Sequence, residues 1–154
     1  MVVDDSAFMR KIISEILAAE EGIQVVGTAR DGLHAMEMVD RLSPDVVTMD
    51  VEMPRLDGIS ALKLIMRWRP TPVVMLSSMT TAGAAVTLRA LDLGAVDFVA
   101  KPSGTISLDL EKVRDELVRK VLAAARARVR REPGSRRGPG PATEGLPPEG
   151  AAGD

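Results

Sequence analysis

The 154-residue sequence contains no cysteine and no tyrosine, only one histidine, and 2% aromatic residues. The absence of cysteine excludes a disulfide framework and a thiolate metal site, and a single histidine cannot form a histidine-rich metal cluster. No apolar run reaches the length of about 18 residues that a membrane span needs, and the first residues lack the basic and apolar regions of a signal peptide. We therefore expect a soluble, cytoplasmic protein without membrane insertion.

The chain is long enough for one domain with a sizeable core. Its net charge is −4 over residues 1–104, +4 over 105–131 and −2 over 132–154. The last stretch contains five prolines, six glycines and a single large apolar side chain, Leu146, so burial there cannot offset the entropy of ordering. The sequence predicts one folded domain over residues 1–131 and a disordered Pro/Gly-rich linker or tail over residues 132–154.

Short apolar runs alternate with segments of helical periodicity along residues 1–131. The predicted strands are Val2–Val3, Ile23–Ala29, Val46–Met49, Val73–Leu76 and Phe98–Ala100. The predicted helices are one capped by Ser6 and closed by Gly22, then Leu33–Leu42 after a turn at Asp31–Gly32, Gly58–Trp68, Ala82–Leu93, and Ser107 to about Arg131. This alternation predicts an α/β fold with a doubly wound, five-stranded parallel sheet, for which 2-1-3-4-5 is a common strand order.

Polar side chains follow the predicted strands at their carboxyl ends. They are Asp4 and Asp5 after the first strand, Asp50 after the third, Ser77 and Ser78 after the fourth, and Lys101 after the fifth. Each alone is typical of a turn or a helix cap. In a parallel sheet these ends meet at one edge, where ligands bind, and a joint cluster of titratable groups indicates a functional site.

Three carboxylates at close range need a cation, and oxygen ligands without histidine or cysteine favour Mg²⁺. A site of this kind serves phosphoryl chemistry, with Asp50 as the nucleophile and with Lys101 and a serine hydroxyl on the phosphoryl oxygens. No strand is followed by a glycine-rich nucleotide-binding loop. The phosphoryl donor is therefore expected to be something other than a nucleotide held in such a loop.

Several segments resemble the receiver domains of two-component response regulators, which have a (βα)5 flavodoxin-like fold. They are Val2–Ser6, Met49–Pro54, Asp57–Gly58 and Lys101–Pro102. Within that family, residues 73–78, 87–91 and 94–99 are similar to the receivers of chemotaxis protein-glutamate methylesterases, and the likeness covers about residues 2–104. A start at Met1 leaves the first strand shorter than is usual in that family.

The resemblance implies that Asp50 accepts a phosphoryl group from a histidine kinase. It also implies a Mg²⁺ site formed by Asp5, Asp50 and the backbone carbonyl of Glu52, with Asp4 assisting through water. Lys101 would then pair with the phosphate.

The resemblance further implies a switch pair formed by Ser77 and Phe98, with Ser78 as the alternative to Ser77. A cis peptide bond between Lys101 and Pro102 is also implied.

The implied partners are the histidine kinase and a methylesterase effector domain, which would follow the linker and is missing from this chain. An association with chemoreceptors is implied as well. His34, the single histidine, is expected on the surface of a helix, so no Ser-His-Asp set can be assembled here. This chain alone is expected to label itself and not to act as an esterase.

Three other interpretations remain beside this one. The chain is a stand-alone signalling receiver if no effector domain follows, and an Asp-nucleophile, Mg²⁺-dependent phosphatase would use Glu52 as the acid two residues after Asp50. Four arginines, Arg126, Arg128, Arg130 and Arg131, suggest nucleic-acid binding, but cations are also favourable at a helix C-terminus and no stacking aromatics accompany them. We expect no nucleic-acid partner.

The predicted helix Ala82–Leu93 has more apolar surface than one core contact needs. Its two apolar stripes are Ala84-Leu88-Leu91 and Val86-Ala90-Leu93. Because a helix that is apolar over most of its circumference is normally covered, one stripe, together with Phe98 and the start of the last helix, is expected to dock the effector domain.

Overall fold

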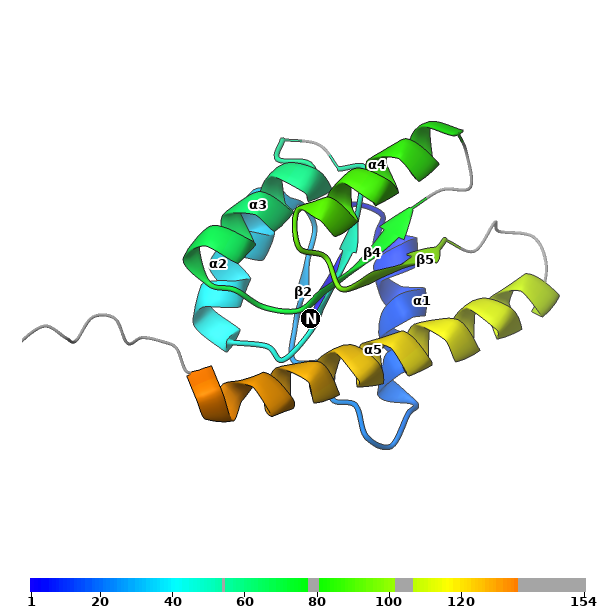
Figure 1. Ribbon diagram of the computed structural model, residues 1–154. Coiled ribbons are helices and arrows are strands. Elements are labelled where there is room, and N and C mark those ends of the chain that lie inside the picture. Colours follow the sequence, from blue (N-terminus) through cyan, green and yellow to red (C-terminus); the bar gives the residue numbers. More distant parts are fainter. Residues whose placement is uncertain (54, 78–80, 102–106, 136–154) are drawn as a thin grey trace, which may run out of the picture.

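The computed structural model describes residues 1–53, 55–77, 81–101 and 107–135. In chain order the elements are β1 Val2–Val3, α1 Ala7–Ala18, β2 Thr28–Ala29, α2 Gly32–Leu42, β3 Val47–Asp50, α3 Gly58–Trp68, β4 Val73–Ser77, α4 Thr81–Asp92, β5 Asp97–Ala100 and α5 Ser107–Ser135. All strand pairs are parallel, and the order is β2-β1-β3-β4-β5 (Figure 1). The predicted doubly wound, five-stranded parallel sheet and its strand order are confirmed. In the part of the chain that the structure describes, no helix has the length and apolarity to cross a membrane.

Each face of the sheet packs against its own helices. α1 and α5 cover one face, where Ile13 and Leu117 are buried against the strands. α2, α3 and α4 cover the other face, where Met49, Leu62 and Ile65 are buried. Because full burial of one such side chain contributes about 1.5–3 kcal/mol, both layers stabilise the central strands that carry the polar edge.

Three helices begin at polar caps that the sequence supplies. The capping oxygens accept backbone N–H groups three residues further on, at 3.2, 2.9 and 2.8 Å, and belong to Ser6 at α1, Asp31 at α2 and Asp57 at α3. A cap of this kind contributes about 1 kcal/mol. The predicted turn at Asp31–Gly32 is therefore the start of α2.

The second strand is shorter than predicted. The sequence predicts Ile23–Ala29, whereas β2 covers only Thr28–Ala29. β2 is an edge strand whose one neighbour, β1, has two residues. The longer prediction was wrong because an apolar pattern indicates burial and not strand pairing. Ile23 is partly buried against the core, but a strand also needs a neighbouring strand with which to form hydrogen bonds.

Two helix ends also differ from the predictions. α1 ends at Ala18 instead of Gly22, because the Glu20 N–H bonds to the Leu17 carbonyl three residues back, at 3.1 Å, and does not continue the four-residue helical pattern. α5 runs to Ser135, beyond the predicted end near Arg131. The predicted cis bond to Pro102, the alternative switch residue Ser78 and residues 136–154 of the predicted tail lie outside the described residues.

The α-ammonium group of Met1 is buried at the start of β1. Its nitrogen donates to the carbonyl oxygen of Val46 at 2.9 Å. A cavity of about 330 Å³ lies beside it, bounded in part by residues 22–26 and 42–46. Burial lowers the pKa of this amine from 8.0 to about 6, although the carboxylate of Asp45 acts in the opposite direction.

We expect this amine to make the free energy of unfolding rise between pH 6 and pH 8. In that range the unfolded chain binds more protons than the folded chain, so protonation favours unfolding. A shift of two pKa units corresponds to about 2.7 kcal/mol. Denaturant unfolding measures the effect, in an Asp50→Asn background so that no second shifted group titrates near pH 7.

N-terminal acetylation is the matched control, because it removes the charge and keeps an N–H donor for Val46. The acetylated chain should show no rise with pH. Equal pH profiles for the two chains would contradict the burial of the amine.

Candidate functional site

The carboxyl ends of β1 and β3 bring three aspartates together. Val3 pairs with Met49 in the sheet, so Asp4 and Asp5 follow β1 beside Asp50, the last residue of β3. Carboxylate oxygens of the three lie within 4.8 Å of one another. Asp4 and Asp50 are buried and Asp5 is exposed, so the cluster is accessible to solvent on the Asp5 side.

Lys101 places a positive charge against the two buried carboxylates. Its Nζ lies 3.3 Å from Asp50 Oδ2 and 3.4 Å from Asp4 Oδ2. Its backbone N–H donates to the carbonyl of Ser77 at 2.8 Å, so the pairing of β5 with β4 positions it. Burial lowers the pKa of Lys101, but the combined attraction of Asp50 and Asp4 raises it above its ordinary value. The ammonium therefore stays charged.

The buried negative charge exceeds what one lysine neutralises. Burial, and then the charge of Asp4, raise the pKa of Asp50 from 3.8 to about 7, against the lowering effects of Lys101 and of the Glu52 backbone N–H. Asp4 Oδ2 has no hydrogen-bond partner among the described residues. Carboxylate oxygens with unmet charge are the donor set that a hard divalent cation takes. These residues fit the predicted metal site.

The loop after β3 contacts Asp50 through its backbone. The Glu52 N–H donates to Asp50 Oδ1 at 3.3 Å, whereas the Glu52 side chain is exposed and its carboxylate is outside the cluster of three. A Cβ at Gly58 would lie 2.2 Å from the carbonyl oxygen of Asp50. Glycine is needed there because the start of α3 approaches this backbone closely.

A second anchor for this loop was not identified from the sequence. Arg55 adopts φ +66°, and its Nη2 lies 3.0 Å from Asp31 Oδ2. Next to it, the Gly32 N–H donates to Leu56 O at 3.0 Å. The hydrogen bond from the His34 N–H, and also the charge of Arg55, hold the pKa of Asp31 below its ordinary value. The start of α2 therefore fixes the loop that flanks Asp50.

Ser77 ends β4 close to Asp50, but its hydroxyl faces α4. Its Oγ lies 2.9 Å from Thr87 Oγ1, and in the described part of the chain it has no hydrogen bond to Asp50. Both hydroxyl-bearing residues are buried. Thr87 was not predicted as a site residue. It could have been recognised as a polar residue at helical spacing from the apolar Ala90, which predicts that both face the interior of the protein.

Phe98, the predicted partner of Ser77, lies on β5 with 39% of its surface exposed. Lys120 of α5 donates to the Phe98 carbonyl at 2.7 Å, and its Nζ lies 5.0 Å from the centre of the Phe98 ring. Glu116 and Asp97 bind the same ammonium at 2.7 and 3.3 Å. Lys120 therefore stabilises the exposed position of the ring, a contact that the sequence pattern did not predict.

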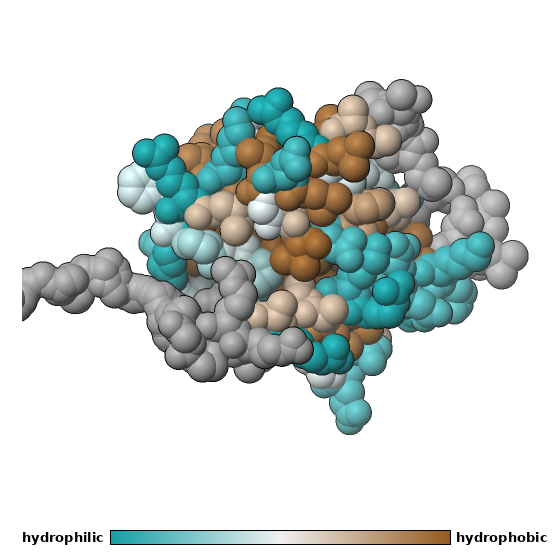
Figure 2. All heavy atoms as spheres, viewed as in Figure 1, coloured by the Kyte–Doolittle hydropathy of each residue, from teal (hydrophilic) through white to brown (hydrophobic). Residues whose placement is uncertain are grey.

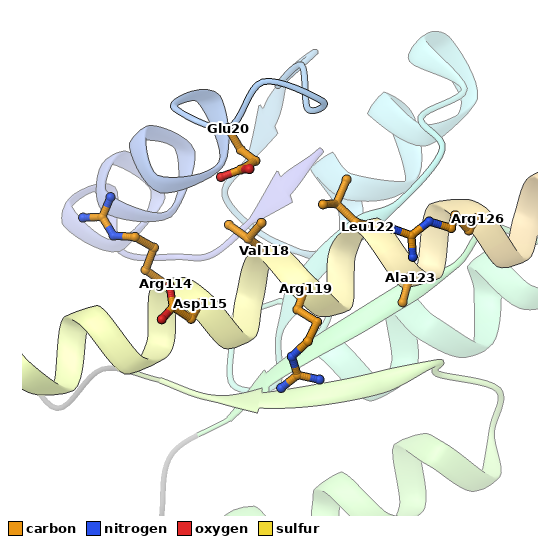
Figure 3. Close-up of a pocket in the computed structure, with 8 residues that line it drawn as sticks. All are labelled: Glu20, Arg114, Asp115, Val118, Arg119, Leu122, Ala123 and Arg126. Atoms are coloured by element: carbon orange, nitrogen blue, oxygen red, sulfur yellow. The ribbon is translucent and has the colours of Figure 1, made fainter.

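A hollow of about 440 Å³ lies on α5 beside α1 (Figure 3). None of the three clustered aspartates, Asp4, Asp5 and Asp50, lines it. Arg114 points toward α1, whereas Arg119 points to the other side, toward β5. Because the guanidinium groups do not converge, they form no common anion site. The single histidine, His34, lies partly exposed in the first turn of α2, and its Nδ1 accepts the Arg30 backbone N–H at 3.2 Å.

Comparison with known proteins agrees with this geometry. The profile of the response regulator receiver domain matches residues 1–111, a range that includes the three aspartates and Lys101. The protein-glutamate methylesterase/protein-glutamine glutaminase of Symbiobacterium thermophilum is 64% identical over 130 residues, which are 84% of this chain and 36% of that protein. Its counterpart in Methanococcus maripaludis is 52% identical over 130 residues, which are again 84% of this chain and 36% of that protein. The chain therefore spans about a third of the length of these curated relatives.

Solved structures show the same similarity. The response regulator domain of Thermotoga maritima CheB has 54% sequence identity and a TM-score of 0.74, with 81% of this chain and 93% of that chain covered. The CheX–CheY–BeF3–Mg²⁺ complex from Borrelia burgdorferi matches with 30% identity and a TM-score of 0.66, covering 79% of this chain and 84% of that chain.

Proposed function

Because the chain belongs to the response regulator receiver domain family, we propose that it is a phosphorylation switch of a chemotaxis-type two-component system. Asp50 accepts a phosphoryl group from a phosphohistidine of a histidine kinase. The phosphorylated receiver then controls a protein-glutamate methylesterase domain outside this chain. The observation that carries the proposal is a buried strand-end carboxylate with two further aspartates and one ammonium around it.

The proposed reaction is an in-line displacement at phosphorus. A carboxylate oxygen of Asp50 forms a P–O bond while the P–N bond to the donor imidazole breaks, and the departing nitrogen takes up one proton. The product is an acyl phosphate. Asp50 attacks as the anion, so its pKa of about 7 makes a nearby cation favourable for reactivity. Bound Mg²⁺ would neutralise carboxylate and phosphoryl charge.

We assign the metal site to Asp5, Asp50 and the Glu52 backbone carbonyl, with Asp4 acting through water. The clustered oxygens support this assignment, as does Asp4 Oδ2, which faces the Lys101 ammonium at 3.4 Å but has no hydrogen bond among the described residues. The similar complex from Borrelia burgdorferi contains Mg²⁺ together with BeF3.

Two groups of this chain are suited to the transferred phosphoryl oxygens. The ammonium of Lys101, 3.3 Å from Asp50 Oδ2, would pair with one oxygen. The hydroxyl of Ser77, at the adjoining end of β4, would donate to another. Phe98 would complete the switch that reports the phosphorylated state.

The surface over α4 and β5 is our proposed docking site for the effector domain. These elements and the turn between them carry exposed apolar side chains, namely Leu88 with 65%, Val96 with 44% and Phe98 with 39% of their surface exposed. Apolar surface lies over these elements in the view of Figure 2. The stripe containing Ala90 faces the core, and Leu91 of the other stripe also packs against it. Ala84 and Leu88 of that second stripe are exposed and available to a partner.

The remaining features follow from the same proposal. The sequence-predicted division into a receiver over residues 1–131 and a linker over residues 132–154 is kept in this proposal with its boundary moved past Ser135, the last residue of α5, and the effector is proposed to follow the linker. The receiver, its kinase and its effector act in the cytoplasm, in association with chemoreceptors. The esterase activity belongs to the effector, because His34 lies in a backbone hydrogen bond at the start of α2 and is the single imidazole of this chain.

Stoichiometry of labelling tests the proposal. With Mg²⁺ and acetyl phosphate, we expect one phosphoryl group per chain, measured by intact-protein mass, and no labelling when a chelator is present. A generic phosphomonoester should not be turned over. Repeated turnover would instead support the Asp-nucleophile phosphatase, although the exposed Glu52 carboxylate is not positioned with the cluster.

A further inference from the structure

We propose that Thr87 is a positioning residue that holds α4 against β4 until Asp50 is phosphorylated. The inference rests on the proposed function and assigns a role to a residue outside the phosphoryl site. Thr87 Oγ1 lies 2.9 Å from Ser77 Oγ, and the two residues are 4% and 6% exposed. This buried hydrogen bond joins the middle of α4 directly to the strand end beside Asp50.

The hydrogen bond lies in the middle of α4, ahead of the apolar core contacts made by its last residues. Ala90 is buried, and Leu91 and Leu93 pack against the same core, but all three follow Thr87 in the sequence. On the N-terminal side, Val86 is only partly buried. The Ser77–Thr87 bond is therefore a polar contact from α4 to β4 that precedes these apolar contacts along the helix.

Phosphorylation of Asp50 would compete for the same serine hydroxyl. Asp50 pairs with Leu76 in the β3–β4 register, so Ser77 is the next residue along β4. The acyl phosphate carries strong acceptor oxygens and about two negative charges in place of the single carboxylate charge, and a hydrogen bond to such a group is stronger than one between two neutral hydroxyls. The side chain of Ser77 turns as a unit about χ1, so its oxygen moves away from Thr87 when it turns toward Asp50.

The consequence appears on the outer surface of the same helix. Leu88, the next residue after Thr87, is 65% exposed on the proposed effector face. When Ser77 turns to the phosphoryl group, α4 loses its side-chain bond to β4, and the position of Leu88 changes relative to β5. Thr87 thereby connects the chemistry at Asp50 to the effector surface.

Thr87→Val tests the proposal, because it replaces the hydroxyl by a methyl group of similar size. Thr48→Val is the matched control, since Thr48 is also buried but its Oγ1 has no hydrogen-bond partner among the described residues. Hydrogen exchange of the α4 amides, with and without acetyl phosphate and Mg²⁺, is the readout. Thr87→Ser keeps the hydroxyl and should behave as the unaltered chain does.

We expect exchange in α4 of the unphosphorylated chain to be roughly two- to tenfold faster in Thr87→Val, the range that one lost hydrogen bond corresponds to. Thr48→Val should leave it unchanged. Phosphorylation should accelerate α4 exchange in the unaltered chain and in Thr87→Ser, and add little in Thr87→Val.

Two results would overturn the proposal separately from the proposed function. They are unchanged α4 exchange in Thr87→Val, and a full phosphorylation response in that variant. A merely structural role for Thr87 would lower stability and leave the phosphorylation response intact. Failure of the unaltered chain to be labelled would overturn the proposed function, and this inference with it.

Discussion

Asp50→Asn is expected to abolish covalent labelling by acetyl phosphate while the fold remains intact. An amide is not a competent nucleophile toward phosphorus, so the P–O bond cannot form. The amide oxygen still accepts the Glu52 N–H that now bonds to Asp50 Oδ1 at 3.3 Å. Intact-protein mass with Mg²⁺ present measures the loss, which should be complete.

The substitution should also raise the free energy of unfolding of the metal-free chain near pH 8. It removes a buried charge that faces Asp4, a repulsion that contributes to the raised pKa of Asp50. Asp40→Asn is the control, because Asp40 is an exposed aspartate paired with Arg69 at 2.8 Å, and that variant should be labelled fully. Undiminished labelling of Asp50→Asn would remove Asp50 from the mechanism.

Lys101→Ala is expected to separate metal binding from the conformational response. Its Nζ is a cation 3.3 and 3.4 Å from the oxygens of Asp50 and Asp4, so its removal takes away a competing positive charge. Mg²⁺ affinity should be retained and strengthened severalfold. The phosphorylated variant, however, lacks the ammonium that pairs with the phosphoryl group, so α4 should no longer respond.

Calorimetric titration with Mg²⁺ and hydrogen exchange of α4 measure the two effects in the same variant. Lys63→Ala is the control, since Lys63 is an exposed lysine of α3. That chain should match the unaltered one in both measurements. Loss of Mg²⁺ affinity in Lys101→Ala together with a normal α4 response would show that the division of roles is wrong.

The central parts of the candidate site could be predicted because they depend on strand ends. The residues Asp4, Asp5, Asp50 and Lys101 each follow an apolar run in the sequence. A parallel sheet brings such ends to one edge whatever the details of packing. The structure confirms their proximity, while their roles in phosphoryl transfer stay predictions.

The positioning contacts could not be predicted in this way. The pair formed by Arg55 and Asp31 joins the loop after β3 to the start of α2, and Lys120 reaches β5 from α5. Neither pair has a characteristic spacing, because each depends on how two separate elements pack. The bond between Ser77 and Thr87 is of the same kind.

The sequence by itself determined the alternation of strands and helices, the cap at Ser6, and the chemical types gathered at the sheet edge. These properties follow from local periodicity and from residue chemistry, which act over a few positions. Tertiary structure alone decided that β2 is two residues long, which stripe of α4 faces the core, and that the Ser77 hydroxyl faces Thr87. The physical reason is that burial and hydrogen bonding of these groups depend on neighbours that lie far away along the chain or on another element, and no local pattern encodes them.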